Sequence, residues 1–218
     1  VRKAIKKIEY KLTTDQINAI NEINLDLKSN QKMFRLLQGD VGSGKTIVAL
    51  ISSLNVIDSG YQVGLMAPTE ILANQHYKLA KKLFDKNINI KLLTSKTEFV
   101  ERKTILKSLE KNKINILIGT HSLFQEKIKY SKLGLIIIDE QHKFGVNQRK
   151  RLSDKGGENC DILLMTATPI PRTLTMTIYG DMDISIINEK PKTRKLVKTY
   201  SKLESKINDI IQFIKKEI

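Results

Sequence analysis

Apolar segments of strand length alternate with helical segments along most of the chain, and this order predicts an α/β domain with a mainly parallel β-sheet sandwiched by helices. Two further observations favour this fold. Residues 135–138 form a continuous apolar run, which is typical of strands buried on both faces of a parallel sheet. The chain has 218 residues, a length that makes one large or two small domains and buries a core without disulfide or metal support.

The individual strands and helices follow from the apolar runs and from the helical periodicity between them. The predicted strands cover residues 34–38, 63–67, 90–94, 115–119, 135–139, 162–166 and 184–187. The predicted helices cover residues 15–29, 45–59, 71–84, 96–111 and 173–178.

Both ends of the chain differ from its middle. Residues 1–11 are strongly basic and predict an incoming linker, and residues 12–188 form the predicted domain. Residues 189–218 predict a linker followed by the start of a second domain or a C-terminal helix. Isoleucines at helical spacing after Leu203 predict an amphipathic helix, whose apolar face packs either on this same core or on a following domain.

Composition excludes several classes of protein. The single cysteine, Cys160, cannot form an internal disulfide, and no apolar run is long enough for a transmembrane helix. The chain starts at Val1 and has no signal peptide, which is typical of a piece of a longer cytosolic protein. The net charge of +15 favours a polyanionic partner. A lysine-rich coding bias explains the same charge equally well.

A complete phosphate-binding motif follows the first predicted strand and opens the next helix. It consists of Gly39, Asp40, Val41, Gly42, Ser43, Gly44, Lys45 and Thr46. Glycines let the backbone approach phosphate oxygens, and the free N–H groups of a helix start attract an anion. Lys45 then reaches the β- and γ-phosphates, and the Thr46 hydroxyl is a ligand for Mg²⁺. The motif predicts a site for a nucleoside triphosphate, with ATP and Mg²⁺ as cofactors.

Two acidic residues end a later buried strand and complete such a site. Asp139 closes the strand at 135–139 and is expected to hold Mg²⁺ at the carboxyl edge of the sheet. Glu140 is placed to orient and deprotonate an attacking water, so Glu140 and Lys45 are the catalytic candidates. Acidic residues after a strand also cap helices, but that alternative is weak behind a complete phosphate loop.

Gln16 and Tyr10 are candidates for recognising the base. The amide of Gln16 suits the edge of an adenine, and the ring of Tyr10 suits its face. The segment from Thr13 to Gln16 also reads as a helix capping box, which gives Gln16 a purely local role.

Three other segments follow strands in the same way. Ala67–Pro68–Thr69–Glu70 and Gly119–Thr120–His121 place small residues and hydroxyls at helix starts, where they suit a nucleic-acid backbone. Taken singly, each segment also reads as a helix cap. Thr166–Ala167–Thr168 places two hydroxyls beside the expected γ-phosphate.

In this order the motifs resemble the first motor domain of superfamily-two helicases, and more narrowly the RecG type of ATP-dependent DNA helicase. The matching segments are L-T-x-x-Q, G-D-V-G-S-G-K-T, A-P-T-E, G-T-H-S-L, D-E-Q-H and T-A-T-P-I-P-R-T-L, together with D-M-D-I-S-I-I near residue 184. The Mfd type of translocase shares two of these motifs and is the nearest alternative. A non-catalytic nucleotide- or DNA-binding module is a second alternative.

The resemblance implies a RecA-like fold and a function in remodelling forks and Holliday junctions during recombination and repair. It implies that Gln141, His142 and Thr166–Thr168 couple the nucleotide to DNA, and that Pro68, Thr69, Glu70, Gly119, Thr120 and His121 contact DNA. The implied partners are branched or duplex DNA, an N-terminal wedge domain and a second motor domain, with no membrane. The implied location is the bacterial cytoplasm, in association with the nucleoid. A histidine such as His142 would, away from this motif, more often be structural.

Overall fold

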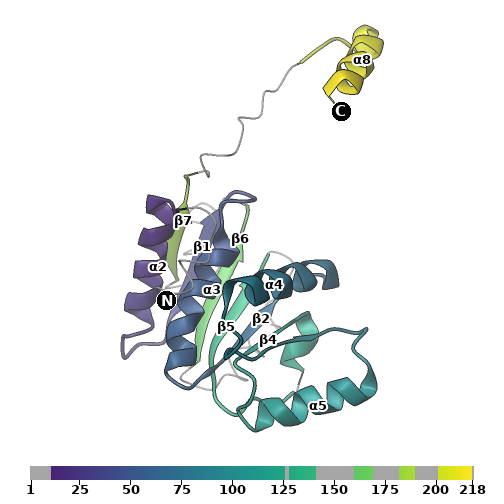
Figure 1. The fold of residues 1–218 in the computed structure, drawn as a ribbon. Coiled ribbons are helices and arrows are strands. Elements are labelled where there is room, and N and C mark those ends of the chain that lie inside the picture. The colour runs from purple at the N-terminus through teal and green to yellow at the C-terminus, as the bar shows by residue number, and fades with distance from the viewer. Residues whose placement is uncertain (1–10, 126–127, 141–159, 169–181, 190–200, 218) are drawn as a thin grey trace.

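The structure is a computed structural model that describes residues 11–125, 128–140, 160–168, 182–189 and 201–217 (Figure 1). The predicted helix at 173–178 and nearly all of the predicted linker at 1–11 lie outside these residues. The described part confirms the predicted α/β architecture, with helices on both sides of a central sheet.

The sheet has seven strands in the order β3-β4-β2-β5-β6-β1-β7, and every pairing in it is parallel. The strands are β1 (Phe34–Gly39), β2 (Gln62–Met66), β3 (Ile90–Leu93), β4 (Ile116–Gly119), β5 (Leu133–Asp139), β6 (Asp161–Thr166) and β7 (Asp183–Ile187). Each predicted strand is confirmed to within two residues at either end. The continuous apolar run in β5 is buried from Gly134 onward, as expected for a strand covered on both faces.

Most of the helices connect parallel strands, since a parallel pair needs a crossover, but the first precedes β1 and the last follows β7. They are α2 (Thr14–Asp26), α3 (Lys45–Asp58), α4 (Glu70–Leu83) and α5 (Phe99–Glu110), followed by the terminal α8 (Ile207–Glu217). Short 3₁₀ turns cover His121–Phe124 and Glu204–Lys206. Within the described ranges, every helix is too short or too polar to span a lipid bilayer.

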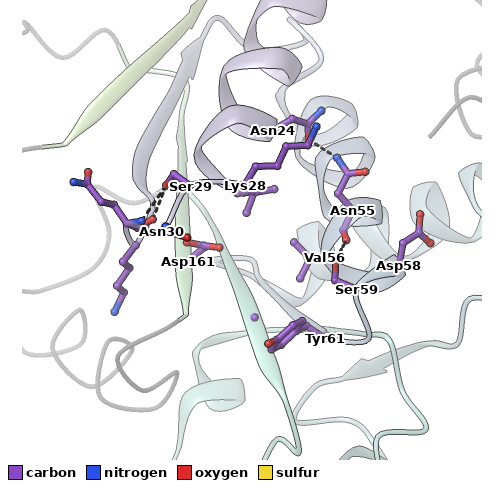
Figure 2. A pocket seen from close by; sticks show the side chains of 14 residues that line it. Asn24, Lys28, Ser29, Asn30, Asn55, Val56, Asp58, Ser59, Tyr61 and Asp161 are labelled. Carbon is purple, nitrogen blue, oxygen red and sulfur yellow. Dashed lines mark hydrogen bonds between the residues drawn. The ribbon is translucent and has the colours of Figure 1, made fainter.

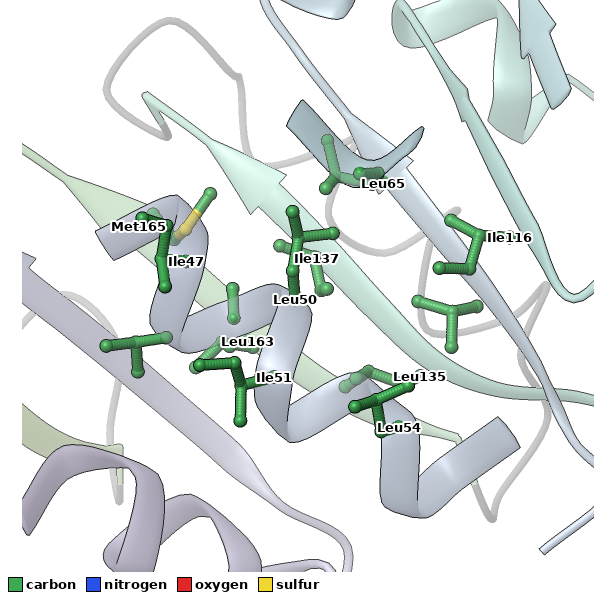
Figure 3. Close-up of a cluster of buried hydrophobic side chains, with 14 of the residues drawn as sticks. Ile47, Leu50, Ile51, Leu54, Leu65, Ile116, Leu135, Ile137, Leu163 and Met165 are labelled. Carbon is green, nitrogen blue, oxygen red and sulfur yellow. The ribbon is translucent and has the colours of Figure 1, made fainter. Parts of the chain in front are cut away.

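Two apolar cores form on the two faces of the sheet. Along β5, Leu135 and Ile137 enter one core while Ile136 and Ile138 enter the other, because successive side chains of a strand point to opposite faces. Helices α2, α3 and α4 cover the first face, and α5 covers the second. Figure 3 shows how one flank of α3 packs against the strands, and the residues labelled there are Ile47, Leu50, Ile51, Leu54, Leu65, Ile116, Leu135, Ile137, Leu163 and Met165.

A buried arginine ties the first helix to the edge of the sheet. Arg35 on β1 is 8% exposed, and its Nε donates to Asp26 Oδ2 on α2 at 2.6 Å. Its Nη1 donates to Ser185 Oγ on β7 at 2.9 Å. Burial of a charge is tolerated when the charge is paired and hydrogen-bonded in this way. The network therefore fixes α2, β1 and β7 against one another, which sets the frame for the loop that follows β1.

The amphipathic helix at the C-terminus is confirmed, as α8. Its apolar residues Ile207, Ile211 and Ile214 are 55%, 45% and 49% exposed, so they are not part of either core. Both alternatives for the apolar face of this helix, packing on the core of this domain or on a following domain, stay predictions. The assignment of residues 189–218 to a linker and the start of another domain stays a prediction.

Candidate nucleotide site and nucleic-acid interface

The candidate residues within the described ranges gather at the carboxyl edge of the sheet. In the parallel register, Gln38 of β1 lies opposite Thr166 of β6, and Met165 of β6 lies opposite Asp139 of β5. The loop after β1, the hydroxyl of Thr166 and the carboxylate of Asp139 therefore lie at the carboxyl ends of three adjacent strands. This edge is where ligands bind in open α/β sheets.

The phosphate-binding motif has the backbone that its glycines predict. Gly44 has a φ of 89° and immediately precedes α3, whose first residue is Lys45. This φ favours glycine, and a Cβ at Gly44 would also displace the side-chain amide of Gln16. Ser43 Oγ is buried and has no hydrogen-bond partner among the described residues. An unpartnered hydroxyl at a helix start fits an anionic ligand such as phosphate.

Lys45 lies at the centre of the site. Its Nζ donates to the carbonyl oxygens of Gly39 at 2.6 Å and Asp40 at 3.1 Å. Burial lowers the pKa of Lys45 below its ordinary value, and attraction to the carboxylates of Asp139, Glu140 and Asp40 opposes that shift. This attraction places Lys45 and both acidic candidates in one electrostatic site. A phosphate that reaches Lys45 would replace the two carbonyl acceptors with a charged one, which makes a stronger hydrogen bond.

The two acidic candidates differ in their surroundings. Asp139 is 7% exposed, and its Oδ2 lies 2.7 Å from Nε2 of His76 on α4. Glu140 is half-buried and has a φ of 52°, in the left-handed region that non-glycine residues rarely adopt. Such a conformation costs about 1–3 kcal/mol and is concentrated at functional sites. Sequence reasoning assigns no role to His76, because a single histidine on an amphipathic helix has no pattern of its own.

The residues present fit a magnesium ion. The described residues contain no cluster of three or more His, Cys, Asp or Glu side chains that could cage a metal. Magnesium in nucleotide sites does not need such a cage, because it takes one or two protein oxygens together with phosphates and water. The carboxylate of Asp139 and the hydroxyl of Thr46, beside Lys45 at the start of α3, supply that kind of oxygen ligand.

Gln16 connects the start of α2 to the phosphate-binding loop. The capping box at the start of α2 is confirmed, because Gln16 Oε1 accepts from the Thr13 N–H at 3.0 Å. Its Nε2 donates to the Ser43 carbonyl at 2.7 Å, which ties α2 to the phosphate-binding loop. Recognition of adenine by Gln16 stays a prediction. Tyr10 lies outside the described residues, and so do Gln141 and His142.

The segment that follows β7 contacts the first turn of α2. Asp15 Oδ2 accepts from the backbone N–H groups of Asn188 and Glu189 at 2.8 and 2.9 Å. These two residues directly follow β7. The first turn of α2 therefore contacts both the phosphate-binding loop, through Gln16, and the segment after the last strand.

Thr166 and Thr168 form a compact hydroxyl pair beside the loop. Thr166 is fully buried, and its Oγ1 lies 2.8 Å from that of Thr168. The Thr168 N–H donates to Thr166 Oγ1 at 3.2 Å. Ala167 is half-buried between them. Their role in coupling nucleotide to DNA stays a prediction, although β6 places them between the two halves of the nucleotide site.

The two predicted DNA-contacting segments lie side by side. The Ala67 N–H donates to the Gly119 carbonyl at 2.8 Å. This hydrogen bond joins the residue after β2 to the last residue of β4. Thr69 caps α4 and accepts from the Leu72 N–H at 3.3 Å. Thr120 is buried and His121 is exposed. The capping interpretation of Thr69 is thus confirmed, and its contact with DNA stays a prediction.

Glu70 has a local function in this region. Its Oε1 accepts from the Ser95 N–H at 2.9 Å and from Ser95 Oγ at 2.5 Å. The hydrogen bond from the Ser95 hydroxyl holds the pKa of Glu70 below its ordinary value. The carboxylate therefore orders the loop after β3. Because a carboxylate repels phosphate, this geometry favours an indirect role for Glu70 over a direct DNA contact.

Gly119→Ala is expected to destabilise the fold by about 1–3 kcal/mol. An added Cβ would overlap with the Leu93 carbonyl oxygen and lie 2.9 Å from Leu123 Cδ2. Urea unfolding measures the effect. The double variant with Leu123→Ala relieves only the side-chain overlap, so full recovery in that variant would contradict the backbone explanation.

A separate pocket lies at the opposite edge of the sheet (Figure 2). It has a volume of about 770 Å³ and is lined by residues at the ends of α2 and α3, such as Lys28 and Asn55, and by Asp161 at the start of β6. None of the predicted site residues lines it. The pocket and the candidate nucleotide site are therefore distinct places on the domain.

Residues 13–177 match the family model described as DEAD/DEAH box helicase. The match includes the phosphate-binding loop and both acidic candidates. The chain belongs to the DEAD/DEAH box helicase family. The alternation of parallel strands and helices is thus the motor-domain fold of these helicases.

Named helicases of one type match this DEAD/DEAH box chain along its whole length. It is 51% identical to the ATP-dependent DNA helicase RecG of Aquifex aeolicus, over 100% of this chain and 28% of that protein. It is 48% identical to RecG of Bacillus subtilis, over 98% of this chain and 31% of that protein. A solved structure of RecG bound to a three-way DNA junction superposes with a TM-score of 0.87 at 40% identity, over 99% of this chain and 29% of that one. The chain thus spans less than a third of the length of these relatives.

Proposed function

We propose that the chain is the first motor domain of an ATP-dependent DNA helicase that remodels branched DNA. The observation that carries this proposal is the meeting of the phosphate-binding loop, Thr166 and Asp139 at one edge of the sheet, in a chain similar throughout to RecG helicases. The electrostatic attraction between Lys45 and the carboxylates of Asp139 and Glu140 supports a shared nucleotide site.

Each part of the site has a role in this proposal. The loop N–H groups and Lys45 bind the triphosphate, and Thr46 and Asp139 hold Mg²⁺. When bound, Mg²⁺ neutralises negative charge on the β- and γ-phosphates. Glu140 orients the attacking water and accepts its proton. Gln16 positions the loop through Ser43 and, with Tyr10, recognises the base.

DNA binds across the carboxyl ends of β2 and β4 in the same proposal. The joined segments Ala67–Thr69 and Gly119–His121 present helix starts and hydroxyls there, which suit backbone phosphates. The net charge of +15 supports attraction to a polyanion. Gln141, His142 and Thr166–Thr168 then couple DNA contact to the nucleotide.

Branched DNA is favoured over an unbranched substrate by the relatives. The solved relative with a TM-score of 0.87 is described as RecG bound to a three-way DNA junction, and the curated relatives described above carry the RecG name. Neither the Mfd-type translocase nor a non-catalytic module is supported in this way. We propose that a wedge domain and a second motor domain belong to the longer protein, since the chain covers 28% of the Aquifex aeolicus relative.

The 218-residue chain is expected to bind Mg·ATP weakly and to hydrolyse it slowly, with little stimulation by DNA. In helicases of this kind the second motor domain contributes an arginine that stabilises the transferring phosphoryl group, an effect of about 10³–10⁵ in rate. Phosphate release is measured for the chain and for its full-length parent, with three-way junction, linear duplex and single-stranded DNA. The parent should respond most strongly to the junction. Robust DNA-dependent turnover by the 218-residue chain, or an equal response of the parent to all three DNAs, would contradict the proposal.

A further inference from the structure

A buried histidine contacts the carboxylate at the proposed magnesium site. His76 lies in the second turn of α4, and Asp139 is the last residue of β5. Their Nε2 and Oδ2 atoms are 2.7 Å apart, and the two side chains are only 8% and 10% exposed. Nothing in the motif of Asp139 requires this partner, because His76 is far away in the sequence.

The geometry limits what His76 can do. Its ring contacts Oδ2 of Asp139 and not Oδ1, so the hydration shell of a cation would meet this carboxylate at Oδ1. A carboxylate at a strand end can rotate about its last torsion, and a hydrogen bond to one oxygen fixes that rotation. Partners of this kind orient a metal-ligating side chain without touching the metal.

The helix that carries His76 is itself well anchored. Ala73 and Ala80, on the same flank of α4, are fully buried in the first core, and Thr69 caps the first turn. The imidazole is therefore held on a rigid element, which is what a positioning group needs. In a purely structural explanation, the pair only satisfies two buried polar groups. That explanation predicts that loss of His76 lowers the stability of the fold and leaves the Mg²⁺ requirement of nucleotide binding unchanged.

We propose that His76 is a positioning residue that fixes the Asp139 carboxylate for Mg²⁺-dependent nucleotide binding. This inference rests on the proposed function, because it assumes that Asp139 meets Mg²⁺ at this edge. Since α4 begins directly after the proposed DNA-contacting residues 67–69, His76 also connects that segment to the magnesium site through one helix.

The test compares four variants of the 218-residue chain. His76→Ala removes the contact. His76→Gln places an amide nitrogen near the position of Nε2, whereas the shorter side chain of His76→Asn does not reach it. Leu79→Ala is the matched control, because Leu79 lies on the same helix, is partly buried against the first core and has no polar group to bond Asp139. Binding of a fluorescent ATP analogue is measured during a Mg²⁺ titration and in excess EDTA, and melting temperatures are recorded for every variant.

His76→Ala and His76→Asn should raise the Mg²⁺ concentration needed for half-maximal binding by about 10–100-fold, while binding in EDTA stays at the wild-type level. His76→Gln should recover most of the loss, and Leu79→Ala should lower the melting temperature with no change in the Mg²⁺ requirement. A wild-type Mg²⁺ requirement in His76→Ala would overturn the proposal. So would equal behaviour of the Gln and Asn variants, or the same shift in Leu79→Ala. If the wild-type chain itself shows no Mg²⁺-dependent binding, the proposed function fails, and this inference fails with it.

Discussion

Lys45→Ala is expected to remove measurable binding of Mg·ATP. The lysine is buried at the start of α3 and already donates to two backbone carbonyls, so its ammonium is held where a triphosphate would lie. Removing one member of a desolvated charge pair costs about 3 kcal/mol or more, on the order of 100-fold in affinity. Titration of a fluorescent ATP analogue measures the loss.

The control for this variant is Lys107→Ala. Lys107 is an exposed lysine in the last turn of α5, on the opposite face of the sheet, and its loss changes the net charge by the same amount. The Lys107→Ala variant should bind nucleotide with the affinity of the wild type. Unchanged affinity in Lys45→Ala, with the melting temperature preserved, would show that the loop after β1 is not the nucleotide site.

Glu140→Gln is expected to keep nucleotide binding and to lose hydrolysis. Glutamine has nearly the same shape as glutamate but cannot accept the proton of an attacking water, and general bases contribute about 10²–10⁴-fold. The effect is measured as single-turnover cleavage of radiolabelled ATP over hours, because the basal rate of the chain is expected to be low.

A variant of Asp139 separates the role of binding Mg²⁺ from the role of general base. Asp139→Asn removes charge one residue earlier, and it should weaken Mg²⁺-dependent binding itself. If Glu140→Gln also lost binding, Glu140 would share the role proposed for Asp139. Wild-type cleavage by Glu140→Gln would exclude Glu140 as the base.

The helices and strands can be predicted from the sequence because each one depends on residues within its own segment. The apolar run at 135–138 is long enough to be a strand and too short for a helix, and β5 is found there. The differences also have local causes. Helix α5 begins at Phe99 and not at 96, since Thr94 and Thr97 form a turn in which the Thr94 N–H donates to Thr97 Oγ1 at 3.0 Å.

Long-range pairings cannot be predicted in this way. Nothing in the composition of β1 indicates that it lies between β6 and β7, because apolar strands of similar length are interchangeable in pattern. The phosphate-binding loop and the acidic strand end are recognised from residue type and spacing. The contact between His76 and Asp139 is not, since it depends on how α4 packs across the sheet.

The position of β1 has a consequence for how the domain is made on the ribosome. Its neighbours in the sheet are β6 and β7, which start at Asp161 and Asp183. The strand that leads into Gly39 thus emerges early in translation and gains its hydrogen-bonding neighbours only near the end of the domain. Non-local pairing of this kind slows folding. A nascent chain halted before Asp161 would lack both neighbours of β1, so the nucleotide pocket is a late product of synthesis.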